Sequence, residues 1–239
     1  MAHFAQSPSF ILHQVTCQFA TGDILFGPLN LSLDASVCAL VGRNGSGKTR
    51  LLRLLGGVDE PASGHIERFG THVYVAQQQD ISADTTLAGL LGYDAIFAAR
   101  TRIDGGHYEP DDLDTLDGYW DLAERLSQAF IAAKLPSFEP NKRAAELSGG
   151  ERIRALLCGA FTADADYLLL DEPTNHLDSQ GRVWFYEQLS RYQGGVLVAS
   201  HDRELLAQVP RILELSALGL RSYGGNYADY RTQRNAEQL

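Results

Sequence analysis

The chain has 239 residues, 44% of them hydrophobic and 21% charged, which is enough to bury the core of one domain with room for a satellite subdomain. Its 30 acidic and 20 basic side chains give a formal net charge of −10, so the surface as a whole is not a phosphate-backbone binder. The N-terminus lacks a secretory pattern and no apolar run approaches the roughly 20 residues of a membrane span, so we expect a soluble, cytoplasmic protein.

The cysteines predict neither a disulfide framework nor a zinc site. Cys17, Cys38 and Cys158 are odd in number, widely spaced and set in apolar surroundings. This pattern is typical of unpaired, buried thiols in a reducing compartment.

The first part of the chain predicts strands, then a strand, loop and helix in succession. Residues 10–33 alternate as strands do, with expected breaks at 22–23 and 27–28. Residues 37–41 are a short apolar run, a glycine-rich loop follows at once, and residues 49–55 carry leucines at helical spacing. This order is half of a βαβ unit.

The middle of the chain predicts a helical subdomain. A short strand over 73–76 ends at Gln77, and the sequence then becomes helical as far as about residue 145. Residues 104–124 hold eight acidic side chains and neither Lys nor Arg, so we expect a solvated acidic face that opposes contact with phosphate backbones. An apolar stripe at helical spacing is expected to pack inward: Leu113, Leu116, Trp120 and Ala123.

The last part alternates helices and strands, which predicts a parallel sheet with helical layers. The expected elements are a helix to about residue 161, a strand over 167–170, a helix over 180–192, a strand over 196–199, a hairpin of 211–215 and 219–223, and a helix beginning near Tyr230.

Residues 42–49, Gly-Arg-Asn-Gly-Ser-Gly-Lys-Thr, match the phosphate-binding pattern G-x-x-x-x-G-K-S/T in full. The glycines let backbone N–H groups turn toward a phosphate chain, and the following helix adds its positive dipole end. Lys48 would reach the β and γ phosphates, and the Thr49 hydroxyl would sit on Mg²⁺. A glycine-rich turn that binds nothing is the alternative, and the flanking strand and helix argue against it.

Asp171 and Glu172 follow four apolar residues, so both carboxylates emerge at the carboxyl edge of a buried strand, where ligands bind in open α/β sheets. Asp171 would hold Mg²⁺, and Glu172 would orient and polarise the attacking water as general base. A surface turn or a helix cap is the alternative for such a pair, and the phosphate loop upstream weighs against it.

A third motif, Leu147-Ser148-Gly149-Gly150-Glu151, is by itself only a plausible helix N-cap. With the two motifs above, it makes nearly the whole chain resemble an ATP-binding cassette (ABC) nucleotide-binding domain. The resemblance implies an α/β fold: a P-loop NTPase (RecA-like) core with an antiparallel β subdomain and an inserted α-helical subdomain. We expect one domain over 1–239, with core and β subdomain in 9–80 and 148–230, the helical subdomain in 81–147, and the start of a linker helix in 231–239.

The resemblance also implies roles for single residues. Gln77 resembles the Q-loop glutamine, Asp178 the D-loop aspartate, and His201 the switch histidine that contacts the γ-phosphate. Phe19 resembles the aromatic that stacks on adenine, although an alternating strand needs apolar residues in any case. We expect ATP to be bound by Phe19, Gly42, Asn44, Gly45, Ser46, Gly47, Lys48 and Thr49. The expected catalytic residues are Gln77, Glu172 and His201, and the expected Mg²⁺ ligands are Thr49, Gln77 and Asp171. The expected signature residues, which cover the ATP of a partner cassette, are Ser148, Gly149, Gly150 and Glu151.

Within the superfamily, residues 174–178 (Thr-Asn-His-Leu-Asp) and 225–230 (Gly-Asn-Tyr-Ala-Asp-Tyr) resemble the F subfamily, ABC-F. Members of that subfamily are tandem-cassette ATPases without membrane domains that bind the ribosome. Three features depart from the pattern: the chain holds one cassette, and is expected to be a first one; Arg50 stands where Ser or Thr is common; and the segment between Gln77 and Leu147 leaves little room for a long basic arm.

The resemblance implies a head-to-tail dimer with ATP at the interface, the second cassette coming from another copy or from a missing second half. The expected cofactors are ATP and Mg²⁺, and the ribosome is the expected client. An energy subunit of a membrane transporter is the alternative, since such subunits carry related motifs. An ATP-dependent DNA-repair factor is disfavoured by the acidic helical stretch and the lack of a basic stripe.

Overall fold

The computed structural model of the protein describes residues 9–77, 81–107, 109–225 and 227–237. The expected core boundary at residue 80, Asn226 of the F-type motif, and residues 238–239 of the expected linker helix lie outside the described residues. The chain divides into two compact units, which we call the sheet unit (residues 1–77, 165–175 and 191–239) and the helical unit (residues 78–164 and 176–190). Over the described ranges, no helix has the length and apolar character needed to cross a membrane.

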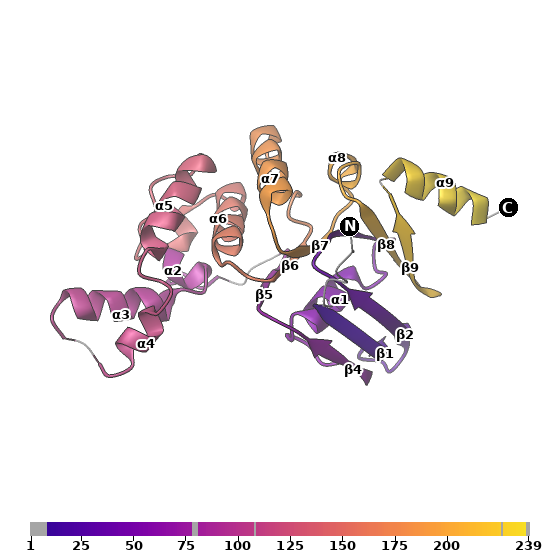
Figure 1. The fold of residues 1–239 in the computed structure, drawn as a ribbon, viewed down its shortest axis with the longest axis horizontal. Coiled ribbons are helices and arrows are strands. Elements are labelled where there is room, and N and C mark those ends of the chain that lie inside the picture. Colours follow the sequence, from indigo (N-terminus) through magenta and orange to yellow (C-terminus); the bar gives the residue numbers. More distant parts are fainter. Residues whose placement is uncertain (1–8, 78–80, 108, 226, 238–239) are drawn as a thin grey trace, which may run out of the picture. The chain divides into compact units, whose positions relative to one another are not determined.

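The sheet unit contains two sheets within its described residues (Figure 1). The smaller is antiparallel, with the order β2-β1-β4. The larger has the order β5-β6-β7-β3-β8-β9 and is parallel except for β9, which pairs antiparallel with β8. The elements of this unit are β1 Phe10–Gln18, β2 Ile24–Leu33, β3 Val37–Val41, α1 Lys48–Leu55, β4 Ser63–Arg68, β5 His72–Val75, β6 Tyr167–Asp171, β7 Gly195–Ala199, α8 Arg203–Leu206, β8 Arg211–Ser216, β9 Gly219–Gly224 and α9 Tyr227–Glu237.

Helix α1 lies between the two sheets and joins them into one core (Figure 1). Its four leucines are all buried and pack in one cluster with side chains of β1 and β2 on one side, such as Phe10 and Phe26, and of β3 and β6 on the other, such as Leu40 and Leu169. Strands β6 and β7 are buried at every residue, as expected for parallel strands covered on both faces. Strands β3 and β6 both contribute to this core. The phosphate loop begins directly after β3, and β6 ends at Asp171.

Three features of this unit differ from the expectations. The expected break at residues 27–28 is a shift in the pairing register within β2 and does not end the strand, because β2 is an edge strand and Pro28 needs no partner for the N–H it lacks. Strand β4 was not expected, because only Ile66 and Arg68 of its six residues are even partly buried and its sequence therefore lacks apolar alternation. Helix α9 begins at Tyr227 instead of near Tyr230, and the Tyr230 ring packs edge-to-face on Tyr223 of β9.

The helical unit consists of helices, with a core formed where Tyr93, Leu122 and Leu126 meet. Its elements are α2 Leu87–Leu90, α3 Asp94–Asp104, α4 Asp112–Leu116, α5 Leu122–Ala132, the 3₁₀ helix η1 Ala144–Glu146, α6 Gly149–Thr162 and α7 Ser179–Arg191, of which Arg191 belongs to the sheet unit. Cys158 of this unit and Cys17 and Cys38 of the sheet unit are all buried and free, which confirms the prediction of unpaired thiols.

The acidic stretch differs from the single amphipathic helix that its spacing predicts. It forms two short helices, α4 and α5, so the helical spacing does not continue across residues 117–121. Leu116 is buried as expected, but Leu113 and Trp120 are 54% and 49% exposed and Ala123 is exposed as well. The prediction of an inward apolar stripe was therefore wrong for three of its four members.

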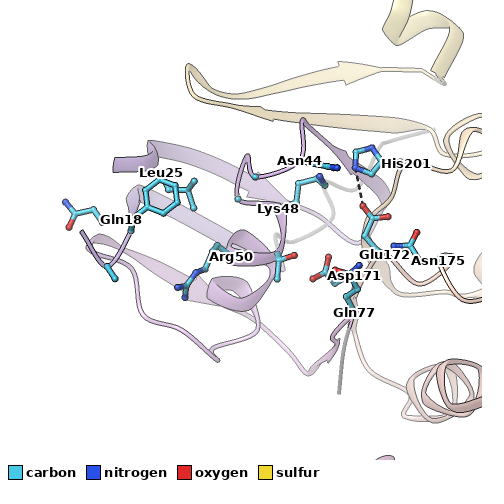
Figure 2. Close-up of a pocket in the computed structure, with 15 residues that line it drawn as sticks. Gln18, Leu25, Asn44, Lys48, Arg50, Gln77, Asp171, Glu172, Asn175 and His201 are labelled. Atoms are coloured by element: carbon cyan, nitrogen blue, oxygen red, sulfur yellow. Dashed lines mark ion pairs between the residues drawn. The ribbon is translucent and has the colours of Figure 1, made fainter. Parts of the chain in front are cut away.

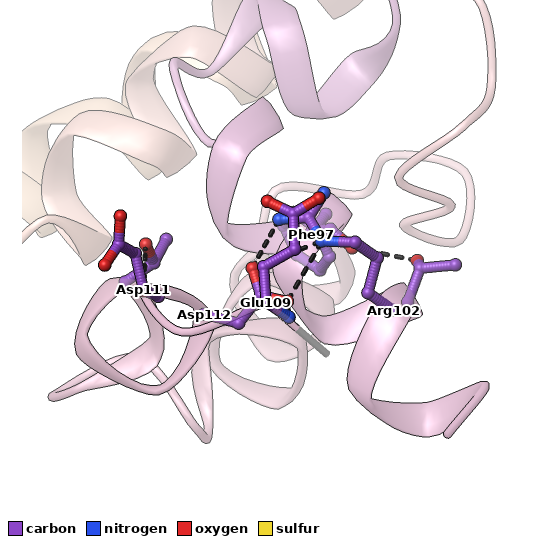
Figure 3. Close-up of polar contacts among 7 residues, drawn as sticks. Phe97, Arg102, Glu109, Asp111 and Asp112 are labelled. Atoms are coloured by element: carbon purple, nitrogen blue, oxygen red, sulfur yellow. Dashed lines mark hydrogen bonds and ion pairs between the residues drawn. The ribbon is translucent and has the colours of Figure 1, made fainter. Parts of the chain in front are cut away.

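The acidic face is also not solvated throughout. Asp112 is buried and forms an ion pair with Arg102 of α3, whose Nε donates to Asp112 Oδ2 at 3.0 Å (Figure 3). The backbone N–H of Glu109 donates to the same oxygen at 2.8 Å. The Arg102 side chain and this N–H lower the pKa of Asp112 below its usual value. The buried carboxylate is thus a structural one that ties the start of α4 to α3.

Candidate active site

The phosphate loop connects β3 to α1 and is held in shape by its neighbours. Gly47 has a φ of +98°, and a Cβ there would lie 2.7 Å from two ring carbons of Phe26, so only glycine fits. Lys48 begins α1, is buried, and its Nζ donates to the carbonyl of Gly42 at 3.0 Å. Burial lowers the pKa of Lys48, and the nearby carboxylates of Glu172 and Asp171 oppose that effect. The ammonium is therefore placed inside the loop, beside the start of a helix that favours anions.

Asp171 is the last residue of β6 and is 1% exposed. Neither of its carboxylate oxygens has a hydrogen-bond partner of normal geometry among the described residues. Burial raises the pKa of Asp171 above its usual value, and the Thr49 hydroxyl and the Lys48 charge nearby oppose that effect. Since buried polar atoms are nearly always paired, two free oxygens in this place indicate that Asp171 is built to receive a ligand.

Glu172 follows in a left-handed backbone conformation, with a φ of +50° that is uncommon for a residue with a side chain. Its N–H donates to Ala199 O at 2.9 Å, which ties this turn to the end of β7. Oε1 lies 3.4 Å from Nε2 of His201, whereas Oε2 is buried and has no partner in the described part of the chain. Burial raises the pKa of Glu172, with His201 and then Lys48 opposing the rise.

These residues line one pocket of about 700 Å³ in the sheet unit. Figure 2 shows the side chains of Asp171, Glu172 and His201 at one end of the pocket and those of Gln18 and Leu25 at the other. Of the expected site residues, the pocket gathers Phe19, Asn44, Gly45, Gly47, Lys48, Thr49, Gln77, Asp171, Glu172 and His201. Gly42 and Ser46 belong to the same loop but are not lining residues. The pocket thus brings together side chains from both ends of the sequence.

Four lining residues were missed: Gln18, Ala20, Leu25 and Asn175. Gln18 and Ala20 are the sequence neighbours of Phe19. The expected role of Phe19 in the ATP site could therefore have indicated that both line the pocket. Asn175 stands in the Thr-Asn-His-Leu-Asp run, three residues after Glu172, and its N–H donates to Glu172 O at 3.2 Å. Leu25 had no signal in the sequence, because its role depends on how β2 packs beside the loop.

Arg50 also lines the pocket, and its guanidinium is held by an acidic partner. Arg50 Nη1 lies 2.7 Å from Asp59 Oδ2, and Arg53 binds both oxygens of the same carboxylate at 2.8 Å. The Arg53 hydrogen bonds are the main cause that lowers the pKa of Asp59 to about 2, with Arg50 adding to it. Arg50 is therefore a charged side chain at the mouth of the pocket where the family commonly has a hydroxyl.

The expected signature and D-loop residues lie in the helical unit, where Ser148, Glu151 and Asp178 form local hydrogen bonds. Ser148 caps α6: its hydroxyl accepts from Glu151 N–H at 3.3 Å, and the Glu151 carboxylate accepts from Ser148 N–H at 2.8 Å. These hydrogen bonds lower the pKa of Glu151. Asp178 accepts from Gly181 N–H at 2.7 Å near the start of α7. A Cβ on Gly149 would meet nothing within 4 Å, so its backbone is open to an approaching molecule.

The donor set at the end of the pocket fits a hard divalent cation. Asp171 offers two free carboxylate oxygens next to the Thr49 hydroxyl, and Gln77 lines the same pocket. Carboxylate, hydroxyl and amide oxygens are the ligands that Mg²⁺ takes, usually with several waters and the phosphates of a substrate. The free oxygens of Asp171 therefore support the expected Mg²⁺ position.

The chain is similar in sequence to a translational throttle protein and to an antibiotic resistance ATP-binding protein. The energy-dependent translational throttle protein EttA of Mycobacterium tuberculosis is 34% identical over 224 residues, which cover 84% of this chain and 39% of that protein. The tylosin resistance ATP-binding protein TlrC of Streptomyces fradiae is 30% identical over 97% of this chain and 47% of its own length. The chain thus spans less than half the length of these relatives.

Solved structures agree in fold. An ATP-binding subunit of an ABC transporter has a TM-score of 0.72 over 95% of this chain and 93% of its own, at 16% identity. A dimeric ATP-binding cassette in a post-hydrolysis state has a TM-score of 0.69 over 90% of this chain and 98% of its own, at 21% identity. They confirm the α/β P-loop NTPase fold. The family profile described as ABC transporter matches residues 27–175, and with the relatives above it shows that this chain belongs to the ABC family, as one ATP-binding cassette of the ABC-F type.

Proposed function

We propose that the chain binds and hydrolyses ATP with Mg²⁺ in the pocket of the sheet unit. The observation that carries this proposal is the buried pair Asp171 and Glu172, three of whose oxygens have no hydrogen-bond partner among the described residues and lie beside the buried Lys48 ammonium. Two buried acids with free oxygens, next to a buried cation at a phosphate loop, suit a ligand that is itself a charged triphosphate with a metal. Structural carboxylates are instead satisfied in place, as Asp112 is.

Each side chain has a separate task in this proposal. Lys48 binds the β and γ phosphates, and Glu172 accepts the proton of the attacking water through Oε2. Burial raises the pKa of Glu172, which makes it a stronger base than an exposed glutamate, and His201 and Lys48 oppose that rise. His201, 3.4 Å from Glu172, orients that carboxylate and contacts the γ-phosphate. Mg²⁺, held by Thr49 and Asp171 with Gln77 nearby, would neutralise charge on the phosphate oxygens.

The phosphate loop and the signature motif would act in trans. In the proposed head-to-tail dimer, Ser148 and Gly149 of one cassette cover the ATP held by the loop of the other. The open space around Gly149 supports this proposal, because a backbone N–H at the start of α6 can then meet an incoming phosphate. The dimeric ATP-binding cassette bound to ADP and Pi gives a precedent in the same fold. A monomer is expected to be a slow ATPase.

The client proposed for this cassette is the ribosome. One relative is named a translational throttle protein and another a tylosin resistance protein. In addition, residues 174–178 have the sequence that resembles the F subfamily. The chain spans less than half the length of those relatives, and in the proposed dimer its ATP site is completed by the signature motif of a second cassette. We therefore expect dimerisation to accompany ribosome binding, and one variant can test both.

The test uses Glu172→Gln, which is expected to bind ATP without turning it over. With ATP and Mg²⁺ the variant should become dimeric at about tens of micromolar, a weak-complex scale, and should co-sediment with ribosomes. Without nucleotide it should do neither. The matched control is Glu172→Gln combined with Lys48→Ala, which should lose both responses because the phosphates lose their cation. Equal pelleting with and without ATP would contradict an ATP-gated ribosome factor.

The second candidate is the energy subunit of a membrane transporter. Two observations favour it: the matching family profile is that of ABC transporters, and a metal-chelate type ABC transporter shares the fold, with a TM-score of 0.66 at 23% identity. The same Glu172→Gln variant discriminates between the two candidates. A membrane protein that co-purifies with it in place of ribosomes would favour the transporter role.

A further inference from the structure

A second group of chemically capable side chains lies outside the ATP pocket, on the antiparallel sheet. His13 of β1 and His65 of β4 are directly opposite each other in the strand pairing, and Glu67 is two residues further along β4. His65 and Glu67 are exposed and His13 is partly exposed. One donor atom from each residue can be chosen so that all three lie within 4.8 Å of one another.

The backbone holds this group in place. Gln14 has a φ of +51° and the register shifts between His13 and Thr16, so β1 bulges next to His13. On the facing strand Gly64 has a φ of +82°, and a Cβ there would lie 2.4 Å from the carbonyl oxygens of His13 and Gln14. Only glycine permits so close an approach, which fixes His65 against His13. The strand pairing therefore fixes the backbone positions of the three donor residues next to one another.

The distances fit a transition-metal ion. Glu67 Oε1 lies 3.0 Å from Nε2 of His13 and 3.7 Å from Nε2 of His65. Ligands at 2.0–2.1 Å from a tetrahedral Zn²⁺ lie about 3.3 Å apart, and the two measured distances bracket that value. The two imidazole rings are stacked, with centroids 4.5 Å apart and 19° between their planes, so one ring must turn about its Cβ–Cγ bond before both nitrogen lone pairs point at one ion. The His65 side chain, 67% exposed, has room for that turn.

We propose that His13, His65 and Glu67 bind one ion of the Zn²⁺ class. Two imidazoles and a carboxylate select Zn²⁺, Co²⁺, Ni²⁺ or Cu²⁺ over Mg²⁺, which takes oxygen ligands. The fourth position is open to water. The ion ties β1 to β4, and because it binds only the folded sheet, it stabilises that sheet. Strand β1 ends at Gln18, a lining residue of the ATP pocket, so the site lies on the strand that leads directly to Phe19.

An ordinary ion pair is the competing explanation: a protonated His13 bound to Glu67 would account for the 3.0 Å contact alone. It would also include His65, whose Nε2 lies 3.7 Å from the same Glu67 oxygen, but it would not bind metal. The two explanations therefore differ in whether the group binds a metal ion and loses that binding when His65 is removed.

The test is a titration of the tag-free full chain, first stripped of metal with a chelator, with Co²⁺ followed by its visible absorption and then with Zn²⁺. Millimolar Mg²⁺ is kept present so that the carboxylates of the ATP pocket are occupied. The wild type should bind one equivalent that His65→Ala and Glu67→Gln bind about 10- to 100-fold more weakly or not at all. His107→Ala, an exposed histidine of the helical unit, is the matched control and should bind like the wild type.

Zn²⁺ should also raise the melting temperature of the wild type and of His107→Ala, but not that of the two site variants. Because the His65 side chain is 67% exposed, its removal should leave the metal-free melting temperature nearly unchanged. Glu67→Gln keeps the size of the side chain and decides the question if His65→Ala folds poorly. Equal stoichiometry with affinities within twofold for the wild type and a folded site variant would overturn the proposal.

Discussion

Asp171 of the sheet unit and Asp112 of the helical unit are buried to the same degree, at 1% and 2% exposed, but they are treated in opposite ways. Asp112 has the Arg102 guanidinium and the Glu109 N–H as partners, and its pKa is lowered. Asp171 has two free oxygens, and its pKa is raised. A buried carboxylate whose oxygens all have hydrogen-bond partners stabilises the fold. A buried carboxylate in a pocket whose oxygens lack such partners can bind a ligand. Five predictions test this distinction and the pocket in which Asp171 lies.

The largest effect is expected for Glu172→Gln, which belongs with the unsatisfied group. Removing a general base should lower the rate of ATP hydrolysis by about 10²- to 10⁴-fold, while ATP binding stays within a few fold. Phosphate release and binding of a fluorescent nucleotide measure the two quantities. A variant that still hydrolyses ATP at more than about a tenth of the wild-type rate would remove Glu172 from the chemistry.

The next effect concerns the loop that faces Asp171. Gly47→Ala adds a methyl group 2.7 Å from the Phe26 ring at a φ of +98°, so it should destabilise the fold by about 1–3 kcal/mol and abolish ATP binding. Gly45→Ala is the matched control, because its φ is +81° but its Cβ would meet nothing within 4 Å. It should cost only backbone strain, about 1 kcal/mol. Urea unfolding measures both, and equal losses would show that the Phe26 contact is unimportant.

The comparison itself is tested by two isosteric changes. Asp171→Asn should stabilise the nucleotide-free protein at neutral pH by about 1 kcal/mol, because it removes a buried charge that has no partner. Asp112→Asn should destabilise it, because Arg102 loses its carboxylate. Urea unfolding without nucleotide or Mg²⁺ gives both signs. Two changes of the same sign would break the distinction between satisfied and unsatisfied acids.

The pH dependence of these two variants sharpens the same test. The pKa of Asp171 is raised in the fold, so its favourable contribution is present below about pH 4 and is lost as pH rises through the folded pKa; the advantage of Asp171→Asn should therefore grow toward neutral pH. The pKa of Asp112 is lowered, so its contribution is present above about pH 4 and is lost as pH falls through the folded value. The penalty of Asp112→Asn should shrink in acid.

The smallest effect is expected at the rim of the pocket. Phe19 is 51% exposed, so Phe19→Ala should leave stability nearly unchanged. The loss of one ring stacked on adenine should weaken ATP binding by about 0.5–1.5 kcal/mol, or roughly two- to tenfold. Phe69→Ala, at a similarly exposed ring outside the pocket lining, is the control and should change nothing. Equal affinities for the two variants would remove Phe19 from the adenine site.

The sheet unit was more predictable than the helical unit, because its signals are local. The phosphate loop is a contiguous run, and strands such as β6 are continuous apolar runs, since both faces of the sheet are covered. Strand β4 escaped notice because it exposes most of its side chains. The parallel sheet then brings Lys48 and Glu172 together from positions that are far apart in the chain.

In the helical unit, contacts between residues on different helices determine which side chains are buried, and the spacing of apolar residues within one segment did not predict this. The spacing of Leu113, Leu116 and Trp120 suited a single helix, yet the segment divides into α4 and α5 and leaves two of the three exposed. The burial of Asp112 depends on Arg102, which belongs to another helix. The pattern of acidic residues within one segment does not predict a partner on another helix. In the same way, the metal-binding group on β1 and β4 depends on a strand pairing that its sequence did not signal.

The left-handed backbone of Glu172 has a consequence for any attempt to make this cassette more heat-resistant. Its φ of +50° is a conformation that glycine adopts freely and that glutamate adopts at a cost of about 1 kcal/mol or more. Replacement by glycine would relax the turn and remove a buried acid, so a screen that rewards heat resistance alone would be expected to enrich this change. The proposed base would be lost in the same step. Thermal selection at this position therefore runs against catalysis, and a library built for stability should hold residue 172 fixed.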